Sequence, residues 1–187
     1  MKSIYVHFPF CESRCHYCDF YALGRDRTAA SDPARFEQAL ERECALVAGD
    51  LAGRIDTLFF GGGTPSLTHP GAMAAALRPL GISPRLAEGY EWTIEMNPSS
   101  ITPEGLLGYR SLGANRVSMG VQAMRDDLLL TLGRVHKAQA VERALDAVFA
   151  SEIGSVSVDL LCGVPGQSLT DIEGAIEIGR ASCRERV

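Results

Sequence analysis

The chain has 187 residues, enough for one domain with a sizeable core, and its 46% hydrophobic and 22% charged residues are ordinary for a globular protein. The formal net charge of −5 argues against a general nucleic-acid-binding protein, which more often carries a basic excess. No stretch approaches the roughly 20 apolar residues that span a bilayer, and polar residues interrupt the apolar start of the chain. We therefore expect a cytoplasmic protein with no nucleic-acid partner and no transmembrane segment.

Apolar strands and amphipathic helices alternate along the chain. The predicted strands cover residues 3–8, 55–60, 91–96, 116–121 and 156–161. The predicted helices cover residues 33–48, 71–80, 102–112, 138–150 and 170–179, with Asp32 as the N-cap of the first. Residues 23–32 are polar and predict a loop. Five strand–helix units in sequence predict an α/β fold with a parallel sheet.

Residues with unusual chemistry follow most of these strands, and the carboxyl ends of parallel strands meet at one edge of a sheet. We therefore expect one composite site in a core domain of residues 1–179. Residues 180–187 turn abruptly basic and finish no predicted element, so we interpret them as a truncation scar or a foreign tail.

The strongest motif is the C-x3-C-x2-C run formed by Cys11, Cys15 and Cys18. Three thiolates on one loop can each bind one iron of a cubane cluster, which leaves the fourth iron open to a substrate or cofactor. The alternative is a structural zinc ion, completed by His7 or His16. In a chain without an evident signal peptide, this clustering favours a metal site over a disulfide framework.

A glycine run, Gly61 to Gly63, follows the second strand and precedes Thr64. Glycines let the backbone approach a ligand closely, although such a run after a strand is often only a turn. It matches neither the dinucleotide fingerprint nor the P-loop spacing.

Polar residues also stand at or after the later strands: Glu95, Gln122, Arg134 and Asp159. A carboxylate inside an apolar strand is costly unless it is paired, so Glu95 and Asp159 are candidate site residues. A solvated strand end is the alternative for both. Cys44 and Cys162 are expected to be small buried hydrophobic residues.

The chain resembles a known family in several motifs that occur in order. These motifs are residues 5–11 (YVHFPFC), 17–20 (YCDF), 60–66 (FGGGTPS), 95–98 (EMNP), 113–122 (GANRVSMGVQ), 132–136 (LGRVH) and 159–167 (DLLCGVPGQ). Together they resemble the radical S-adenosylmethionine superfamily, and within it the oxygen-independent coproporphyrinogen III oxidase-like family, which includes the haem chaperones.

The resemblance implies a partial TIM-like βα barrel of about five parallel units, with the last strand and a C-terminal domain lacking. It implies a [4Fe-4S] cluster held by Cys11, Cys15 and Cys18, and S-adenosylmethionine bound to the open iron and cleaved to a 5′-deoxyadenosyl radical. The residues expected to contact that cofactor or line its sites are Tyr5, Tyr17, Gly62, Gly63, Thr64, Glu95, Gln122, Arg134 and Asp159. His7 is expected only as a supporting donor.

Phe20 distinguishes two branches of that family, because the oxidase carries a further cysteine at this position. The first strand also starts at Ser3, without the extension that precedes it in the oxidase. Both departures favour a haem chaperone, which binds haem and passes it to an apo-haemoprotein, over an enzyme that decarboxylates porphyrinogen propionates. Either function implies a reductase or flavodoxin-type electron donor. No catalytic residue is assigned, and a zinc-bound structural module is the remaining alternative.

Overall fold

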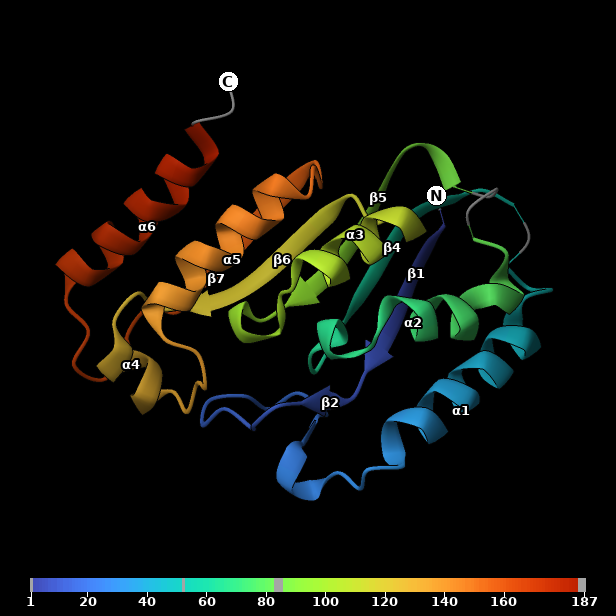
Figure 1. Ribbon diagram of the computed structural model, residues 1–187, viewed down its shortest axis with the longest axis horizontal. Helices are drawn as coiled ribbons and strands as arrows, with labels where there is room; N and C mark the ends of the chain where they lie inside the picture. Colours follow the sequence, from blue (N-terminus) through green and yellow to red (C-terminus); the bar gives the residue numbers. More distant parts are fainter. Residues whose placement is uncertain (1, 52, 83–85, 185–187) are drawn as a thin grey trace.

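The computed structural model describes residues 2–51, 53–82 and 86–184, and its centre is one sheet of five parallel strands (Figure 1). The strands lie in the order β1 (Ser3–Phe8), β4 (Ile55–Gly62), β5 (Leu86–Met96), β6 (Arg116–Gln122) and β7 (Ser155–Leu160). All neighbouring strands in this sheet are parallel. The predicted α/β fold with five parallel units is therefore confirmed.

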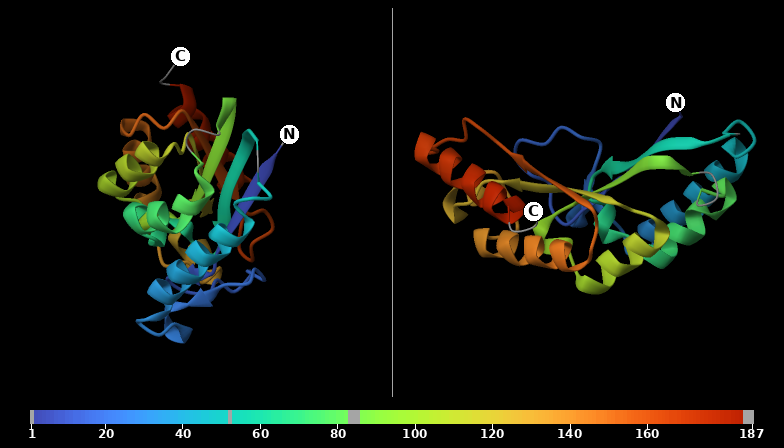
Figure 2. Two further views of the ribbon diagram at one scale, coloured as in Figure 1. Left: turned by 90° about the vertical axis from the view of Figure 1, so that its right-hand side faces the viewer. Right: turned by 90° about the horizontal axis from the view of Figure 1, so that it is seen from above.

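Six α-helices accompany the strands in the described ranges, and four of them cover one face of the sheet. They are α1 (Asp32–Val47), α2 (Pro70–Leu77), α3 (Pro103–Leu112), α4 (Asp126–Thr131), α5 (Ala138–Ala150) and α6 (Leu169–Arg184). Figure 2 shows α1, α2, α3 and α5 side by side along the outer face of a curved sheet. The neighbouring pairs α1 and α2, α2 and α3, and α3 and α5 are in contact. No helix in the described ranges is long and apolar enough to cross a membrane.

The core lies between the sheet and these helices. Phe8, Phe60, Ile94, Val117 and Met119 are at most 1% exposed and come from four neighbouring strands. The predicted apolar side of α5 packs here through Val141, Leu145 and Val148, with Phe149 partly buried at its margin. Burial of this apolar surface holds the sheet against its helices.

Helix ends follow local sequence signals, with one correction. The Thr102 side chain accepts a hydrogen bond from Gly105 N at the start of α3, and Gly113 ends that helix at φ 113°, where glycine is favoured. The N-cap of α1 is Ser31, not Asp32. Asp32 is the first helical residue, and its carboxylate accepts from Ala29 N at 2.8 Å.

Several boundaries differ from the sequence prediction because short or glycine-containing segments carry little periodicity. β4 extends over Gly61 and Gly62, and β5 begins at Leu86. The predicted loop at residues 23–32 contains β3 (Leu23–Gly24), which pairs with β2 (Phe10–Cys11), and α4 was not predicted. Single turns of 3-10 helix also occur: η1 (Arg25–Arg27), η2 (Pro65–Leu67), η3 (Arg78–Leu80) and η5 (Pro98–Ser100).

The end of the chain also departs from prediction. Helix α6 continues without a break to Arg184, beyond its predicted end at residue 179, and the domain boundary expected there stays a prediction. Residues 185–187 of the expected tail lie outside the described residues. The origin of this tail as a scar or foreign segment stays a prediction.

Candidate cofactor site

A pocket of about 320 Å³ opens at the carboxyl ends of the parallel strands. Its lining includes every predicted site residue except Tyr5: Cys11, Cys15, Tyr17, Cys18, Gly62, Gly63, Thr64, Glu95, Gln122, Arg134 and Asp159. Parallel topology brings these residues together although they span nearly 150 positions of the sequence. The roles of these side chains toward a cofactor stay predictions.

The three cysteines follow β1, with Cys11 at the end of β2 and Cys15 and Cys18 on the loop after it, and backbone contacts hold that loop. Cys18 N donates to Cys15 O at 3.2 Å, and His16 N donates to Leu132 O at 3.0 Å. Gly133 adopts φ 72°, and a Cβ there would lie 3.0 Å from the His16 ring. Burial is the main cause that raises the pKa of the Cys11 thiol, and hydrogen bonding from Thr64 opposes it.

The glycine run is shaped by close approach of the backbone. Gly63 N donates to Phe8 O at 2.7 Å, and a Cβ on Gly63 would lie 2.6 Å from Phe10 O. Gly62 adopts φ 111°, and a Cβ there would lie 2.6 Å from the His7 ring. Both positions therefore need glycine, which separates this run from an ordinary turn.

Arg134 links the loops around the pocket. Its Nη2 donates to Asn97 Oδ1 and to Gly120 O, each at 2.6 Å, and its Nη1 donates to Cys15 Sγ at 3.6 Å. Asn97 Nδ2 in turn donates to Thr64 Oγ1 at 2.9 Å. Asn97 is a site residue that the sequence reasoning missed, although it lies in the EMNP motif directly after β5.

Two carboxylates line the side of the pocket formed by the sheet. Glu95 Oε2 accepts from Gly62 N at 3.1 Å, and burial raises the pKa of Glu95. Asp159 is exposed and accepts from Ser118 Oγ at 3.3 Å. Ser118 was also missed, because a serine at an alternating strand position carries no distinctive signal. Glu95 is therefore a partly buried carboxylate with a hydrogen-bond partner, as the sequence suggested. Asp159 instead corresponds to the alternative, a solvated strand end.

Tyr5 and the two candidate zinc-ligand histidines have other partners. The Tyr5 ring stacks against Phe59 and its hydroxyl lies 3.1 Å from His7 Nδ1. His7 Nε2 lies 2.8 Å from Tyr21 O, and His16 Nδ1 lies 3.0 Å from Thr131 O. Among the described residues, no three His, Cys, Asp or Glu side chains are grouped as ligands of a single ion.

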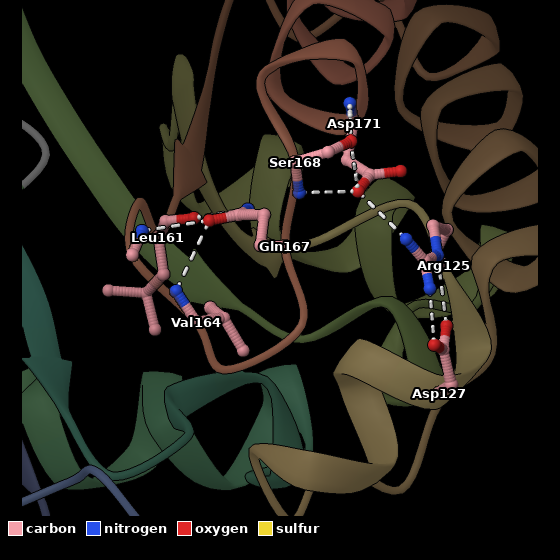
Figure 3. Close-up of polar contacts among 8 residues, drawn as sticks. Arg125, Asp127, Leu161, Val164, Gln167, Ser168 and Asp171 are labelled. Carbon is pink, nitrogen blue, oxygen red and sulfur yellow. Dashed lines mark hydrogen bonds and ion pairs between the residues drawn. The ribbon is translucent and has the colours of Figure 1, made fainter.

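The last loop at this edge, after β7, is closed by the Gln167 side chain (Figure 3). Gln167 Oε1 accepts from Gly163 N at 2.8 Å and from Val164 N at 3.2 Å, and its Nε2 donates to Leu161 O at 2.9 Å. The side-chain amide of Gln167 therefore bonds to backbone N–H and C=O groups of the loop, which lie outside the strands and helices. Cys162 is exposed on this loop, which corrects its expected burial, whereas Cys44 is buried as predicted.

Arg125 then connects this region to α4 (Figure 3). It pairs with Asp127 on α4 and donates to Asp171 Oδ2 at 2.8 Å at the start of α6. Ser168 N also donates to Asp171 at 2.7 Å, and its hydrogen bonds are the main cause that lowers the pKa of Asp171. These exposed contacts border a smaller cavity of about 210 Å³ that shares Gln122 with the main pocket.

Comparison with known proteins agrees with this geometry. The family model of the radical SAM superfamily matches residues 5–178. The chain belongs to the radical SAM superfamily. Membership implies a [4Fe-4S] cluster and S-adenosylmethionine as cofactors, as the motifs predicted.

Curated relatives of the chain include haem chaperones. The chain is 38% identical to the haem chaperone HemW of Bacillus subtilis over 184 residues, covering 94% of this chain and 46% of that protein. It is 36% identical to the mitochondrial radical S-adenosyl methionine domain-containing protein 1 of Bos taurus, over 89% of this chain and 37% of that protein. The chain therefore spans less than half the length of these curated relatives.

Among solved structures, coproporphyrinogen III oxidase (HemN) of Escherichia coli superposes with a TM-score of 0.84 at 25% identity. This match covers 97% of the chain and 41% of the oxidase. The predicted resemblance to the oxidase-like family and its haem chaperones is confirmed.

The residues present fit the cofactors that the radical SAM family implies. Three thiols on one loop line a single pocket, and Arg134 Nε is buried there without a hydrogen-bond partner among the described residues. A buried cationic donor without an acceptor is costly, and an anionic group in the pocket would supply that acceptor.

Proposed function

We propose that this chain is the radical SAM core of a haem chaperone, in which Cys11, Cys15 and Cys18 hold a [4Fe-4S] cluster. When bound, the cluster supplies one electron for reductive cleavage of S-adenosylmethionine. Glu95, Thr64 and Arg134 line the same pocket and offer acceptor and donor groups for the polar ends of that molecule. The similarity to HemW over nearly the whole chain supports the proposal.

Phe20 is the observation that favours haem delivery over porphyrinogen oxidation. It lines the pocket and is 69% exposed, two residues beyond the third cysteine of the proposed cluster motif. The oxidase branch carries a thiol at the matching position, so this chain lacks one reactive group at the pocket entrance. An exposed aromatic ring instead offers an apolar surface, which suits the face of a flat macrocycle such as haem.

The test is a haem titration of the anaerobically purified protein, followed by the haem absorption band. We expect saturable haem binding that weakens in Phe20→Ala and is unchanged in Leu46→Ala, which removes an exposed hydrophobic side chain that does not line the pocket. In parallel, coproporphyrinogen is supplied with S-adenosylmethionine and a reductant. Sustained formation of protoporphyrinogen would overturn the chaperone assignment in favour of the oxidase.

Metal analysis tests the cluster separately. We expect iron and acid-labile sulfide in the anaerobically purified protein, whereas stoichiometric zinc without sulfide would identify the structural-zinc alternative. The proposal further assigns an apo-haemoprotein as recipient, a reductase or flavodoxin-type protein as electron donor, and the cytoplasm as location.

A further inference from the structure

A continuous chain of hydrogen bonds joins two of the three cysteines. It runs from Cys11 through Thr64, Asn97 and Arg134 to Cys15. Thr64 Oγ1 donates to Cys11 Sγ at 3.6 Å, and Arg134 Nη1 donates to Cys15 Sγ at the same distance. This series of hydrogen bonds therefore begins at the sulfur atom of one cysteine and ends at the sulfur atom of another.

The chemistry of Arg134 fixes the direction of every bond in this chain. A guanidinium has donors only, so the atom of Asn97 that faces it, 2.6 Å away, must be the carbonyl oxygen Oδ1. The amide nitrogen Nδ2 therefore faces Thr64 and donates to its hydroxyl. Because that hydroxyl oxygen accepts from Asn97, its proton is free to point at Cys11.

Asn97 is held in the position that this arrangement needs. It follows β5 directly, and its backbone N donates to Ser100 Oγ at 3.3 Å while Ser100 N donates to Asn97 O at 3.0 Å. The buried Pro98 begins the turn η5 between them. The half-buried Asn97 side chain therefore reaches across the pocket between a loop that follows β4 and the segment that precedes α5.

We propose that Asn97 is a positioning residue that raises the reduction potential of the bound cluster by aiming Thr64 at Cys11 and Arg134 at Cys15. The inference rests on the proposed cluster on these cysteines. Reduction adds one electron from the external donor, and therefore one negative charge, to the cluster. Hydrogen bonds to the cysteine sulfurs and a nearby guanidinium stabilise the more negative, reduced form.

The variants Asn97→Ala and Asn97→Asp separate this role from a structural one. Alanine removes both side-chain bonds. Aspartate keeps the shape and the bond from Arg134, but it adds a negative charge and accepts the Thr64 proton, which then no longer points at Cys11. If Asn97 only supported the fold, the isosteric aspartate would be the milder change.

The experiment is a redox titration of the reconstituted protein without S-adenosylmethionine, followed by electron paramagnetic resonance. We expect midpoint potentials more negative than that of the unaltered protein in Asn97→Ala, and still more negative in Asn97→Asp. Ser99→Ala is the matched control, because Ser99 lies on the same turn but its hydroxyl donates to Glu12 at 2.5 Å and bonds neither Thr64 nor Arg134. The potential of this variant is expected to be unchanged. A potential for Asn97→Asp at or near that of the unaltered protein would overturn the proposal.

Thr64→Val and Thr64→Ser provide a second pair in case the Asn97 variants lose the cluster. Valine keeps the shape of threonine without its hydroxyl, so the potential should fall, and serine should restore it. An unchanged potential in Thr64→Val overturns the inference, as does loss of the cluster from all four variants, because tuning requires a cluster that is retained. Absence of iron and sulfide from the unaltered protein would instead reject the proposed function.

Discussion

The two faces of strand β6 show how one strand serves both the fold and the site. Val117, Met119 and Val121 are fully buried against the helices. Ser118, Gly120 and Gln122, which alternate with them, line the pocket, and Arg116 donates to Thr93 and Ser157 on the neighbouring strands. Parallel strands are usually apolar on both faces. A parallel strand with one polar face therefore marks a cavity on that side of the sheet.

The largest effect is expected from a substitution that changes the pocket and leaves the core intact. Cys15→Ala should abolish both cluster assembly and cleavage of S-adenosylmethionine, because it removes one of the three proposed thiolate ligands. The sheet should remain folded, since Cys15 lies outside the buried core. Iron and sulfide content, product analysis and circular dichroism measure these three properties. Cleavage that survives would show that the cysteine triplet is not the ligand set.

The next effect belongs to the core face of the same strand. Met119→Ala should lower the free energy of unfolding by about 2–5 kcal/mol, because it leaves a cavity in a fully buried position. Ser118→Ala, its neighbour on the pocket face, should cost only about 1 kcal/mol through its lost hydrogen bonds. Urea unfolding of both variants compares the faces directly, and equal losses would contradict this contrast.

His136 is a buried polar group close to the strand ends. It is 5% exposed, and burial together with the charge of Arg134 lowers its pKa to about 4, although an interaction with the Val121 backbone opposes the shift. Between pH 6.5 and 4 the unfolded chain binds a proton at this residue that the folded chain does not. The free energy of unfolding therefore decreases as the pH is lowered through this range. The expected loss is at most about 3 kcal/mol.

The variant His136→Leu should lack this component of acid destabilisation. Urea unfolding at pH 7 and pH 4.5 measures the difference between variant and unaltered protein, and that difference should favour the variant more at the lower pH. A difference that does not depend on pH would mean that the pKa of His136 is the same in the folded and the unfolded chain.

The smallest effect is expected at Glu95. Burial raises the pKa of this carboxyl above 4.5, although the hydrogen bond from Gly62 N opposes the shift. The folded chain therefore binds the proton more tightly than the unfolded chain, and stability falls as pH rises through the folded pKa. Glu95→Gln keeps an acceptor for Gly62 and should gain relative stability as pH rises above 4.5. A relative stability that decreases over that range would contradict the raised pKa.

Much of this organisation could be predicted from periodicity and motif spacing. The strand at residues 3–8 and the helix at residues 138–150 match their predicted bounds because both carry a clear apolar pattern. The cysteines, glycines and strand-end polar residues could be placed in one pocket because parallel strands bring their carboxyl ends to one edge.

The rest depends on contacts between distant segments. Asn97 became recognisable only through Arg134, which lies 37 positions further along the chain. The sequence around Cys162 does not determine whether its side chain is buried or exposed. The contacts of Gln167 that close its loop carry no periodic signal either. Tyr5 matches its motif, yet stacking on Phe59 leaves it outside the pocket lining. Side-chain pairing across loops, rather than local propensity, decides such positions.

Gly63 makes main-chain contact with the segment that leads into the cysteine loop. Its missing Cβ leaves room for the carbonyl oxygens of Phe8 and Phe10, at 2.9 Å and 2.6 Å from where that carbon would lie. A side chain can rotate away from a neighbour, but two backbones in contact cannot. A methyl group at this one position would therefore push on the main chain at Phe8 and Phe10, directly before Cys11, so the position of the first cysteine depends on a hydrogen atom in place of a side chain.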